Sequence, residues 1–241
     1  VLRRLVAGAR CVFASTDELA RRIADATPSV RVAPNRLLAS GWFAPLEAQV
    51  VAPDLGERPP LRMIYVGSRT HKEDLDAIEP AIRRAREERG FQLYVVGVDR
   101  EERDGVIRLE PPSTRYDAFV PWLRALAPHF DVALAPLLDH PFNRAKSHLK
   151  FLEYAAVGWP VIASAVGPYA ETVRDGVDGW LVSNDPEAWF EALVRAADDP
   201  ALRERIARNA HARVAAEFVH TSCPFDAIAE LLDSAERRAD G

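Results

Sequence analysis

From Leu61 onward, short apolar runs rich in β-branched and aromatic residues alternate with helical patterns, and this alternation limits the possible fold more than any other feature. The strands expected from these runs cover residues 61–67, 91–97, 105–110, 131–136, 159–164 and 179–183. The helical patterns between and after them cover residues 74–90, 115–127, 146–157, 168–174 and 186–198. Strands separated by helices form parallel sheets that are covered on both faces. We therefore predict an α/β fold with a doubly wound parallel sheet.

The segments on either side of this alternation are less regular. Before it stand two strand-like runs and a helix opened by the capping sequence Ser15-Thr16-Asp17, which are too few elements for a closed sheet. We expect four regions: residues 1–36, the end of another domain; residues 37–60, a proline-containing connector; residues 61–200, the main domain; and residues 201–241, C-terminal helices at about 200–218 and 225–238. Because the chain starts with Val1, we expect it to be part of a longer protein.

Charge and cysteine content exclude several classes of protein. The net charge of -5 argues against a nucleic-acid binder, whose affinity for phosphates needs an excess of lysine and arginine. The cysteines, Cys11 and Cys223, lack the spacing of a disulfide framework or a zinc site. No apolar run approaches the roughly 20 residues that span a bilayer, and no signal peptide is visible. We expect a cytoplasmic protein, with attachment to a membrane surface left open.

The segment KSHLKFLEYAAVGWP, residues 146–160, places charged side chains in an otherwise apolar run. If a helix starts near Lys146, then Lys146, Lys150 and Glu153 lie on one face of it. The remaining residues make this helix apolar nearly all round, so it should be buried, and buried charges need partners. One interpretation is a structural ion pair between Lys150 and Glu153, which leaves Lys146 unexplained.

The other interpretation is an anionic ligand rich in hydroxyl groups. The free N–H groups of Ser147, His148 and Leu149 at the helix start would bind a phosphate. Lys146 would add positive charge, and Glu153 would accept hydrogen bonds from sugar hydroxyls. This interpretation predicts a nucleotide site.

Three loops follow predicted strands, and open parallel sheets bind ligands beyond the carboxyl ends of their strands. These loops are SRTHKED at 68–74, LLDHPFNRAKS at 137–147 and AVGPY at 165–169. In the first loop Arg69, His71 and Lys72 would meet a diphosphate, unless they are solvated loop charges. In the second loop the residues that would meet a sugar are Asp139, His140 and Asn143.

The stretches LRMIYVGSRTHKEDL, DVALAP and FNRAKSHLKFLEYAAVGWPVIASAVGPYAETVRDGVDGWLV resemble, in order and spacing, one known domain. It is the C-terminal donor-binding domain of retaining GT-B glycosyltransferases of the group-one class, and the likeness covers about residues 61–200. The resemblance implies the Rossmann-like half of a GT-B fold. Residues 1–36 are then similar to the end of an N-terminal acceptor domain, and the C-terminal helices would pack back toward that part.

The resemblance implies transfer of a sugar from a nucleotide diphosphate sugar to an acceptor hydroxyl, with retention and without a metal or other cofactor. Basic residues of the first loop neutralise the diphosphate in this family, which implies roles for Arg69 and Lys72. Lys146 is assigned with them as catalytic, and Glu153 matches the glutamate that binds the ribose. The other expected contacts to the donor are Gly67, Ser68, His71, Asn143, Ser147, His148, Leu149 and Lys150. The implied acceptor is a saccharide or a lipid-linked saccharide, met by the full-length protein at the inner membrane face.

The sequence also departs from the family pattern. Many members carry two glutamates separated by seven residues. Glu153 matches the later one, and Ala145 stands at the position of the earlier one. In addition, Ser68 follows Gly67 where many members have arginine. With Asn143, Lys146, Ser147 and Lys150, the chain resembles a subgroup of bacterial polysaccharide and O-antigen transferases. Two alternatives stay open: a nucleotide-sugar 2-epimerase, and a non-catalytic module that binds a sugar or a protein partner. Since catalysis in this family uses a cleft between two domains, we expect this chain alone to bind nucleotide but to transfer sugar poorly.

Overall fold

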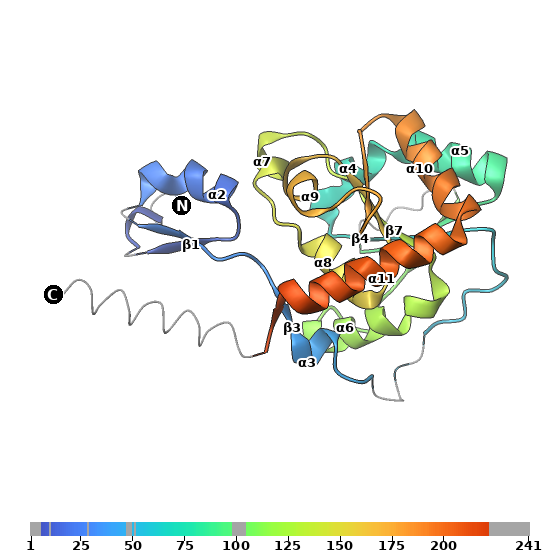
Figure 1. The fold of residues 1–241 in the computed structure, drawn as a ribbon, viewed down its shortest axis with the longest axis horizontal. Coiled ribbons are helices and arrows are strands. Elements are labelled where there is room, and N and C mark those ends of the chain that lie inside the picture. The colour runs from blue at the N-terminus through green and yellow to red at the C-terminus, as the bar shows by residue number, and fades with distance from the viewer. Residues whose placement is uncertain are drawn as a thin grey trace.

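The computed structural model of the chain describes residues 6–9, 11–27, 29–46, 50, 52–97 and 105–221. Figure 1 shows a main body of sheet and helices, with a small N-terminal unit to one side of it. The helix expected at 225–238 lies outside the described residues.

The main body is built on a parallel sheet with six strands in the described part of the chain. These strands are β4 (Arg62–Val66), β5 (Gln92–Val96), β6 (Val106–Leu109), β7 (Val132–Ala135), β8 (Val161–Ser164) and β9 (Trp180–Val182). Their spatial order is β6-β5-β4-β7-β8-β9, so the chain winds to one side of β4 and then returns to build the other side. The predicted doubly wound parallel sheet is confirmed, and its order reverses between β4 and β7, where ligands bind in such folds.

Helices cover both faces of this sheet. The longer ones are α5 (Glu79–Arg89), α6 (Tyr116–Ala125), α8 (Leu149–Val157), α10 (Pro186–Asp198) and α11 (Pro200–Glu217). Successive strand residues point to opposite faces, so Met63 packs in the cluster that contains α5 and α10, while Ile64 packs in the cluster with α6 and α8. Apolar residues are needed on both faces, which is why these strands are continuously hydrophobic.

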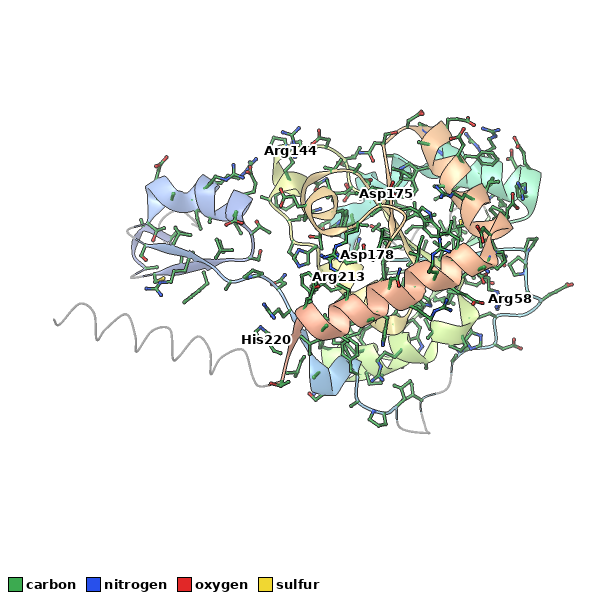
Figure 2. All side chains as sticks on the ribbon, in the orientation of Figure 1. Arg58, Arg144, Asp175, Asp178, Arg213 and His220 are labelled. Atoms are coloured by element: carbon green, nitrogen blue, oxygen red, sulfur yellow. The ribbon has the colours of Figure 1, made fainter. Side chains whose placement is uncertain are left out.

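Helix α11 joins the two apolar clusters across the end of the sheet. Its buried residues Leu202 and Ile206 belong to one cluster, and Ala210 and Val214 belong to the other. Their spacing of four residues puts all of them on one side of the helix. Arg213 on the same helix donates a 2.7 Å hydrogen bond to the buried carboxylate of Asp178. Both residues are labelled in Figure 2.

Three helical predictions differ from the structure. The helix expected at 74–90 is divided into α4 (Lys72–Asp76) and α5, because Pro80 stands in the first turn of α5 and lacks the N–H that a continuous helix needs. A short helix, α7 (Pro141–Arg144), was not expected. Helix α8 begins at Leu149 instead of Lys146, because Thr16 and Asn35 hold the preceding turn through Ala145 O and Ser147 Oγ.

The region 37–60, predicted as a connector, contains two short elements. These are strand β3 (Leu37–Leu38) and helix α3 (Ala39–Trp42). Strand β3 pairs with β10 (Val219–His220), which follows α11, and Trp42 is 1% exposed against α6. Both elements are too short to give a periodic pattern in the sequence.

The N-terminal unit is a parallel pair of strands with one helix. It consists of β1 (Val12–Ala14), α2 (Asp17–Ile23) and β2 (Val30–Val32). The hydroxyl of Thr16 accepts a hydrogen bond from the amide of Leu19 at 3.1 Å, as the capping sequence predicts. These strands are not paired with the main sheet.

Helix α8 ends at Gly158, which has a positive φ of 97° and donates its N–H to the carbonyls of Tyr154 and Ala155. An L-residue is strained in this conformation. We expect Gly158→Ala to lower the free energy of unfolding in urea by about 1 kcal/mol. Gly41→Ala in α3 is the matched control, because both positions have open space for a methyl group but Gly41 has no positive φ. Equal effects of the two substitutions would contradict the argument from backbone strain.

Candidate functional site

A cavity of about 680 Å³ opens beyond the carboxyl ends of β4 and β5, next to α8. We call it the switch-point cavity. Its walls come from the loop after β4, the ends of β4 and β5, the segment before α6, the turn between α7 and α8, and α8 itself. The lining residues that carry the argument are Gly67, His71, Ser147, Lys146, Lys150 and Glu153. Segments up to about 100 residues apart in sequence therefore meet at the site that the topology predicts.

Lys150 reaches into the cavity from the first turn of α8. Its Nζ donates a 2.9 Å hydrogen bond to the hydroxyl of Tyr65 and lies 4.3 Å from the centre of that ring. The pKa of Lys150 is lowered to about 7, mainly by burial and also by the charge of Lys146, while Asp74 and Glu153 oppose the shift. A cation held in this way is available to an anion entering the cavity.

Glu153 lies one turn further along α8 and also lines the cavity. Burial raises the pKa of its carboxyl to about 7, against the opposing effect of Lys150. Within the described residues its carboxylate has neither a hydrogen-bond donor nor an ion-pair partner. The structural ion pair between Lys150 and Glu153 is therefore not formed there, and the carboxylate oxygens keep their capacity to accept hydrogen bonds.

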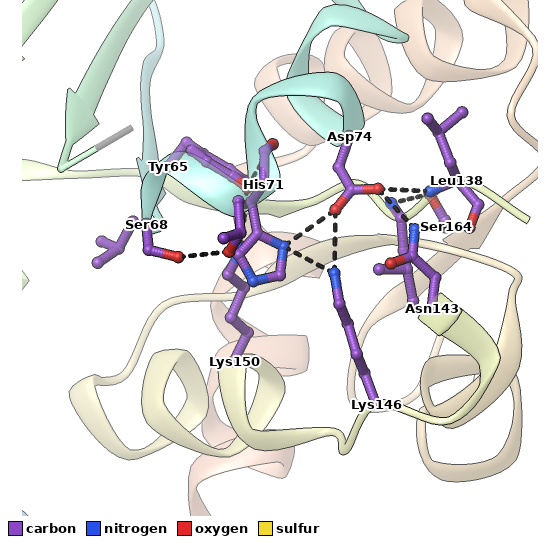
Figure 3. A network of polar contacts seen from close by, with 12 residues as sticks. Tyr65, Ser68, His71, Asp74, Leu138, Asn143, Lys146, Lys150 and Ser164 are labelled. Atoms are coloured by element: carbon purple, nitrogen blue, oxygen red, sulfur yellow. Dashed lines mark hydrogen bonds and ion pairs between the residues drawn. The ribbon is translucent and has the colours of Figure 1, made fainter. Parts of the chain in front are cut away.

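A polar network at one end of the cavity is centred on Asp74, which is 3% exposed (Figure 3). Its carboxylate contacts His71 Nδ1 at 2.9 Å, the amide of Leu138 at 2.9 Å and Asn143 Nδ2 at 2.8 Å. Lys146 Nζ lies 3.5 Å from the same carboxylate and 3.2 Å from His71 Nδ1. Burial alone would raise the pKa of Asp74, but these partners together lower it below its ordinary value.

The end of β4 approaches the cavity through its backbone. The amide of Gly67 donates to Val96 O at 3.0 Å, and a Cβ at Gly67 would lie 2.8 Å from the Tyr65 ring. Only glycine fits this close approach without a shift of the ring. The hydroxyl of Tyr154, on α8, donates to Val66 O and accepts from Val66 N. These contacts fix the end of β4 against the helix that carries Lys150.

The structure brings most of the predicted site residues together. Those that line the cavity are Gly67, Ser68, His71, Lys146, Ser147, Leu149, Lys150 and Glu153. Asn143 is 7% exposed and lies behind them, bonded to Asp74. The side chain of Arg69 lies outside the described part of the structure. What these residues do remains a prediction.

Other predicted residues lie elsewhere. Lys72 Nζ contacts Asp76 at 3.0 Å on the surface of α4 and does not line the cavity. The His148 ring packs against Phe218 with centroids 5.4 Å apart, and burial lowers the pKa of its imidazole. Asp139 pairs with Arg144, and His140 caps α7 by accepting from the amide of Phe142. The spacing of these residues did not reveal which way their side chains point.

Sequence reasoning missed Asp74 and Tyr65. Asp74 stands in the charged run HKED, which looks like a solvated loop, and its partners Leu138 and Asn143 are more than 60 residues away. Tyr65 sits in an apolar strand, where an aromatic residue is ordinary. Its position two residues before Gly67, close to the end of the strand, is the one signal that would have placed it at the cavity.

Two searches confined to the described residues gave negative results. No group of three or more His, Cys, Asp or Glu side chains is placed there to hold a metal ion. No helix in that part of the chain has the length and apolar character that a membrane crossing requires.

Known proteins are similar to the part of this chain that contains the main sheet and the switch-point cavity. Residues 60–199 match the sequence model described as Glycosyl transferases group 1. The D-inositol 3-phosphate glycosyltransferase of Streptomyces griseus is 36% identical over 137 residues, which are 56% of this chain and 27% of that protein. The glycogen synthase of Mycobacterium tuberculosis is 29% identical over 223 residues, 86% of this chain and 49% of that protein. The chain thus spans about a quarter to a half of these relatives.

Solved structures share the fold at low identity. Anabaena HepE, in a complex with UDP and glucose, superposes with a TM-score of 0.69 at 16% identity, over 94% of this chain and 63% of HepE. A sucrose-phosphate synthase from Thermosynechococcus elongatus superposes with a TM-score of 0.64 at 22% identity, over 99% and 60% of the two chains. The α/β fold described above is therefore the fold of solved glycosyltransferase structures.

Proposed function

Because this chain belongs to the group 1 glycosyltransferases, we propose that its switch-point cavity binds a nucleotide diphosphate sugar as the donor of the transferred sugar. One observation carries the proposal: Lys146, Lys150 and Glu153, whose carboxylate has no hydrogen-bond or ion-pair partner in the described part of the chain, line the same cavity. Cations suit a diphosphate, and a carboxylate with free acceptor capacity suits the hydroxyls of a ribose.

From the positions of these groups we propose an end of the cavity for each part of the donor. Lys146, His71 and the Gly67 backbone lie near the polar network, and we place the diphosphate there. Glu153 lies one turn along α8 from Lys150, and we place the ribose against it. We place the base near the lining residues Pro111 and Thr114, in the segment before α6.

The same groups account for a chemical role. When the sugar leaves, negative charge develops on the diphosphate, and fixed cations stabilise it best where it develops. Lys146 and Lys150 are held by Asp74 and Tyr65, so they need little reorganisation as the bond breaks. We propose that they supply the positive charge, without a metal, and that the anomeric configuration is retained.

The acceptor side is a further part of the proposal. The similar proteins are named for inositol phosphate, glycogen and sucrose phosphate, and HepE was solved with UDP and glucose. We propose a saccharide or lipid-linked saccharide as the acceptor, in the synthesis of a cell-surface polysaccharide by the full-length protein. Since GT-B chemistry uses two domains, this chain alone should bind the donor and transfer little sugar.

We expect one of UDP, GDP and dTDP to raise the melting temperature of the chain. A ligand at a hundred times its dissociation constant stabilises the folded state by about 2.7 kcal/mol. Glu153→Ala should abolish most of this stabilisation, because the ribose loses its acceptor. Glu79→Ala, which removes a surface carboxylate paired only loosely with Arg83 at 4.0 Å, should leave it unchanged. A wild-type chain that responds to none of the three nucleotides would refute the proposed donor site.

A further inference from the structure

Asp74 is a buried carboxylate behind the switch-point cavity, and the proposed function gives it no contact with the donor. It is 3% exposed and is not among the residues that line the cavity. A carboxylate buried this completely is costly unless its partners compensate for the loss of water. Its partners come from four segments of the chain: the turn before α4, the loop after β7, α7 and the turn before α8.

The two oxygens of Asp74 divide these partners between them. Oδ1 accepts hydrogen bonds from the amide of Leu138 at 2.9 Å and from Asn143 Nδ2 at 2.8 Å. These donors belong to the loop after β7 and to α7, and Asn143 is itself fixed by a 2.9 Å bond to Leu138 O. Oδ1 is thereby anchored to the scaffold, and this anchoring sets the direction of Oδ2.

Oδ2 faces His71 and Lys146, two of the residues that line the cavity, as Figure 3 shows. It lies 2.9 Å from His71 Nδ1 and 3.5 Å from Lys146 Nζ. A carboxylate oxygen so close to Nδ1 requires a hydrogen on that nitrogen, because two bare acceptors would repel each other. Lys146 then directs a hydrogen to the carboxylate, and Nε2 of His71 donates to a phosphate oxygen when the ring carries a hydrogen on both nitrogens.

We propose that Asp74 is a positioning residue for the diphosphate of the donor, acting through His71 and Lys146. This inference rests on the proposed function, since it assumes that the cavity binds a nucleoside diphosphate. Asp74 touches no part of the ligand. It holds the ammonium of Lys146 and the ring of His71 in the places where the phosphate oxygens meet them, which lowers the cost of ordering these side chains on binding.

The net charge of the cavity, taken alone, predicts the opposite effect of removing Asp74 on diphosphate affinity. Asp74 offsets the charge of Lys146, so removing the carboxylate would make the cavity more positive and should strengthen the binding of an anion. Positioning predicts weaker binding after the same change. The sign of the effect therefore separates the two interpretations, and it can be measured with Asp74→Asn, which keeps the shape of the side chain.

The experiment measures the affinity of the full chain for UDP, GDP and dTDP and for their nucleosides by calorimetry. For the diphosphate that binds best, Asp74→Asn should weaken binding about tenfold, the loss expected for charge-assisted hydrogen bonds. The affinity for the nucleoside should change less than about twofold, because the base and ribose contacts lie elsewhere. In a Lys146→Met background the additional effect of Asp74→Asn should shrink, as expected for residues that act together.

Asp178→Asn is the matched control for loss of a buried carboxylate. Asp178 is 1% exposed and bonded to Arg213 and to the amide of Arg174, away from the cavity. It should lower the melting temperature without changing the ratio of diphosphate to nucleoside affinity. If Asp74→Asn does not fold, Asn143→Leu, which removes one of the two donors to Oδ1, should cause a smaller loss of diphosphate affinity.

Each outcome has one meaning. Diphosphate affinity that is unchanged or increased in Asp74→Asn, or in Asn143→Leu where that variant is used, overturns the positioning role and leaves the donor site intact. Equal losses for diphosphate and nucleoside also overturn it, since they indicate a general disturbance of the fold. A wild-type chain that binds no diphosphate overturns the proposed function first, and the role of Asp74 fails with it.

Discussion

Replacing Lys150 with methionine should weaken the binding of a nucleoside diphosphate by about a hundredfold, the equivalent of one or two charge-assisted hydrogen bonds. The same change should stabilise the empty chain. Lys150 is partly buried, its pKa falls to about 7 because of that burial, and it has no carboxylate partner among the described residues. An apolar side chain of similar length avoids this cost.

Lys72→Met provides the control for a general effect of charge. Lys72 was expected from the sequence to contact the diphosphate, but its Nζ pairs with Asp76 and its side chain is 43% exposed. We expect its removal to change diphosphate affinity by less than about twofold, as is usual for an exposed pair. Calorimetry gives the affinities, and urea unfolding gives the stabilities. Loss of binding in Lys72→Met, with binding intact in Lys150→Met, would mean that the lysine that binds the diphosphate is Lys72 in the first loop.

The fold could be predicted because its signal is local and repeated. Each strand of the main sheet is a short run that is apolar on both faces, as Met63 and Ile64 illustrate, and helical patterns separate these runs. Elements of two to four residues, such as β3 and α7, give no periodic signal and were missed. The start of α8 was placed too early because Thr16 and Asn35, which hold the preceding turn, are more than 100 residues away.

The candidate site could be predicted only in part, for the same reason. Lys150 and Glu153 are conspicuous because they interrupt an apolar helix, and both line the cavity. His71 and Lys72 are adjacent in sequence, yet the backbone turns one toward the cavity and the other toward Asp76. The role of Asp74 could not be predicted from the sequence, because its partners lie on other segments of the chain. Sequence shows where charge is unusual, whereas the fold decides which charges meet.

The pair Lys150 and Glu153 should give the free energy of unfolding a characteristic dependence on pH. Burial raises the pKa of Glu153 from 4.5 to about 7, so between these values the folded chain holds a proton that the unfolded chain has lost. Stability due to Glu153 therefore falls as the pH rises from 4.5 to 7. Burial lowers the pKa of Lys150 from 10.5 to about 7, so above pH 7 the unfolded chain holds the extra proton. Stability due to Lys150 therefore rises from pH 7 to 10.5.

The two effects together place the largest penalty near pH 7. We expect the double variant Lys150→Met, Glu153→Gln to be more stable than wild type there by about 2 kcal/mol or more, within the range measured when buried charges are replaced by neutral groups. The difference should shrink toward pH 5 and toward pH 10, and subtracting the two urea-unfolding profiles removes the contribution of all other titrating groups. A difference that is constant with pH would show that neither side chain is desolvated by the fold. A difference that peaks near pH 7 means that the empty site is held at a cost to stability, as expected where charged groups are kept in place for a ligand.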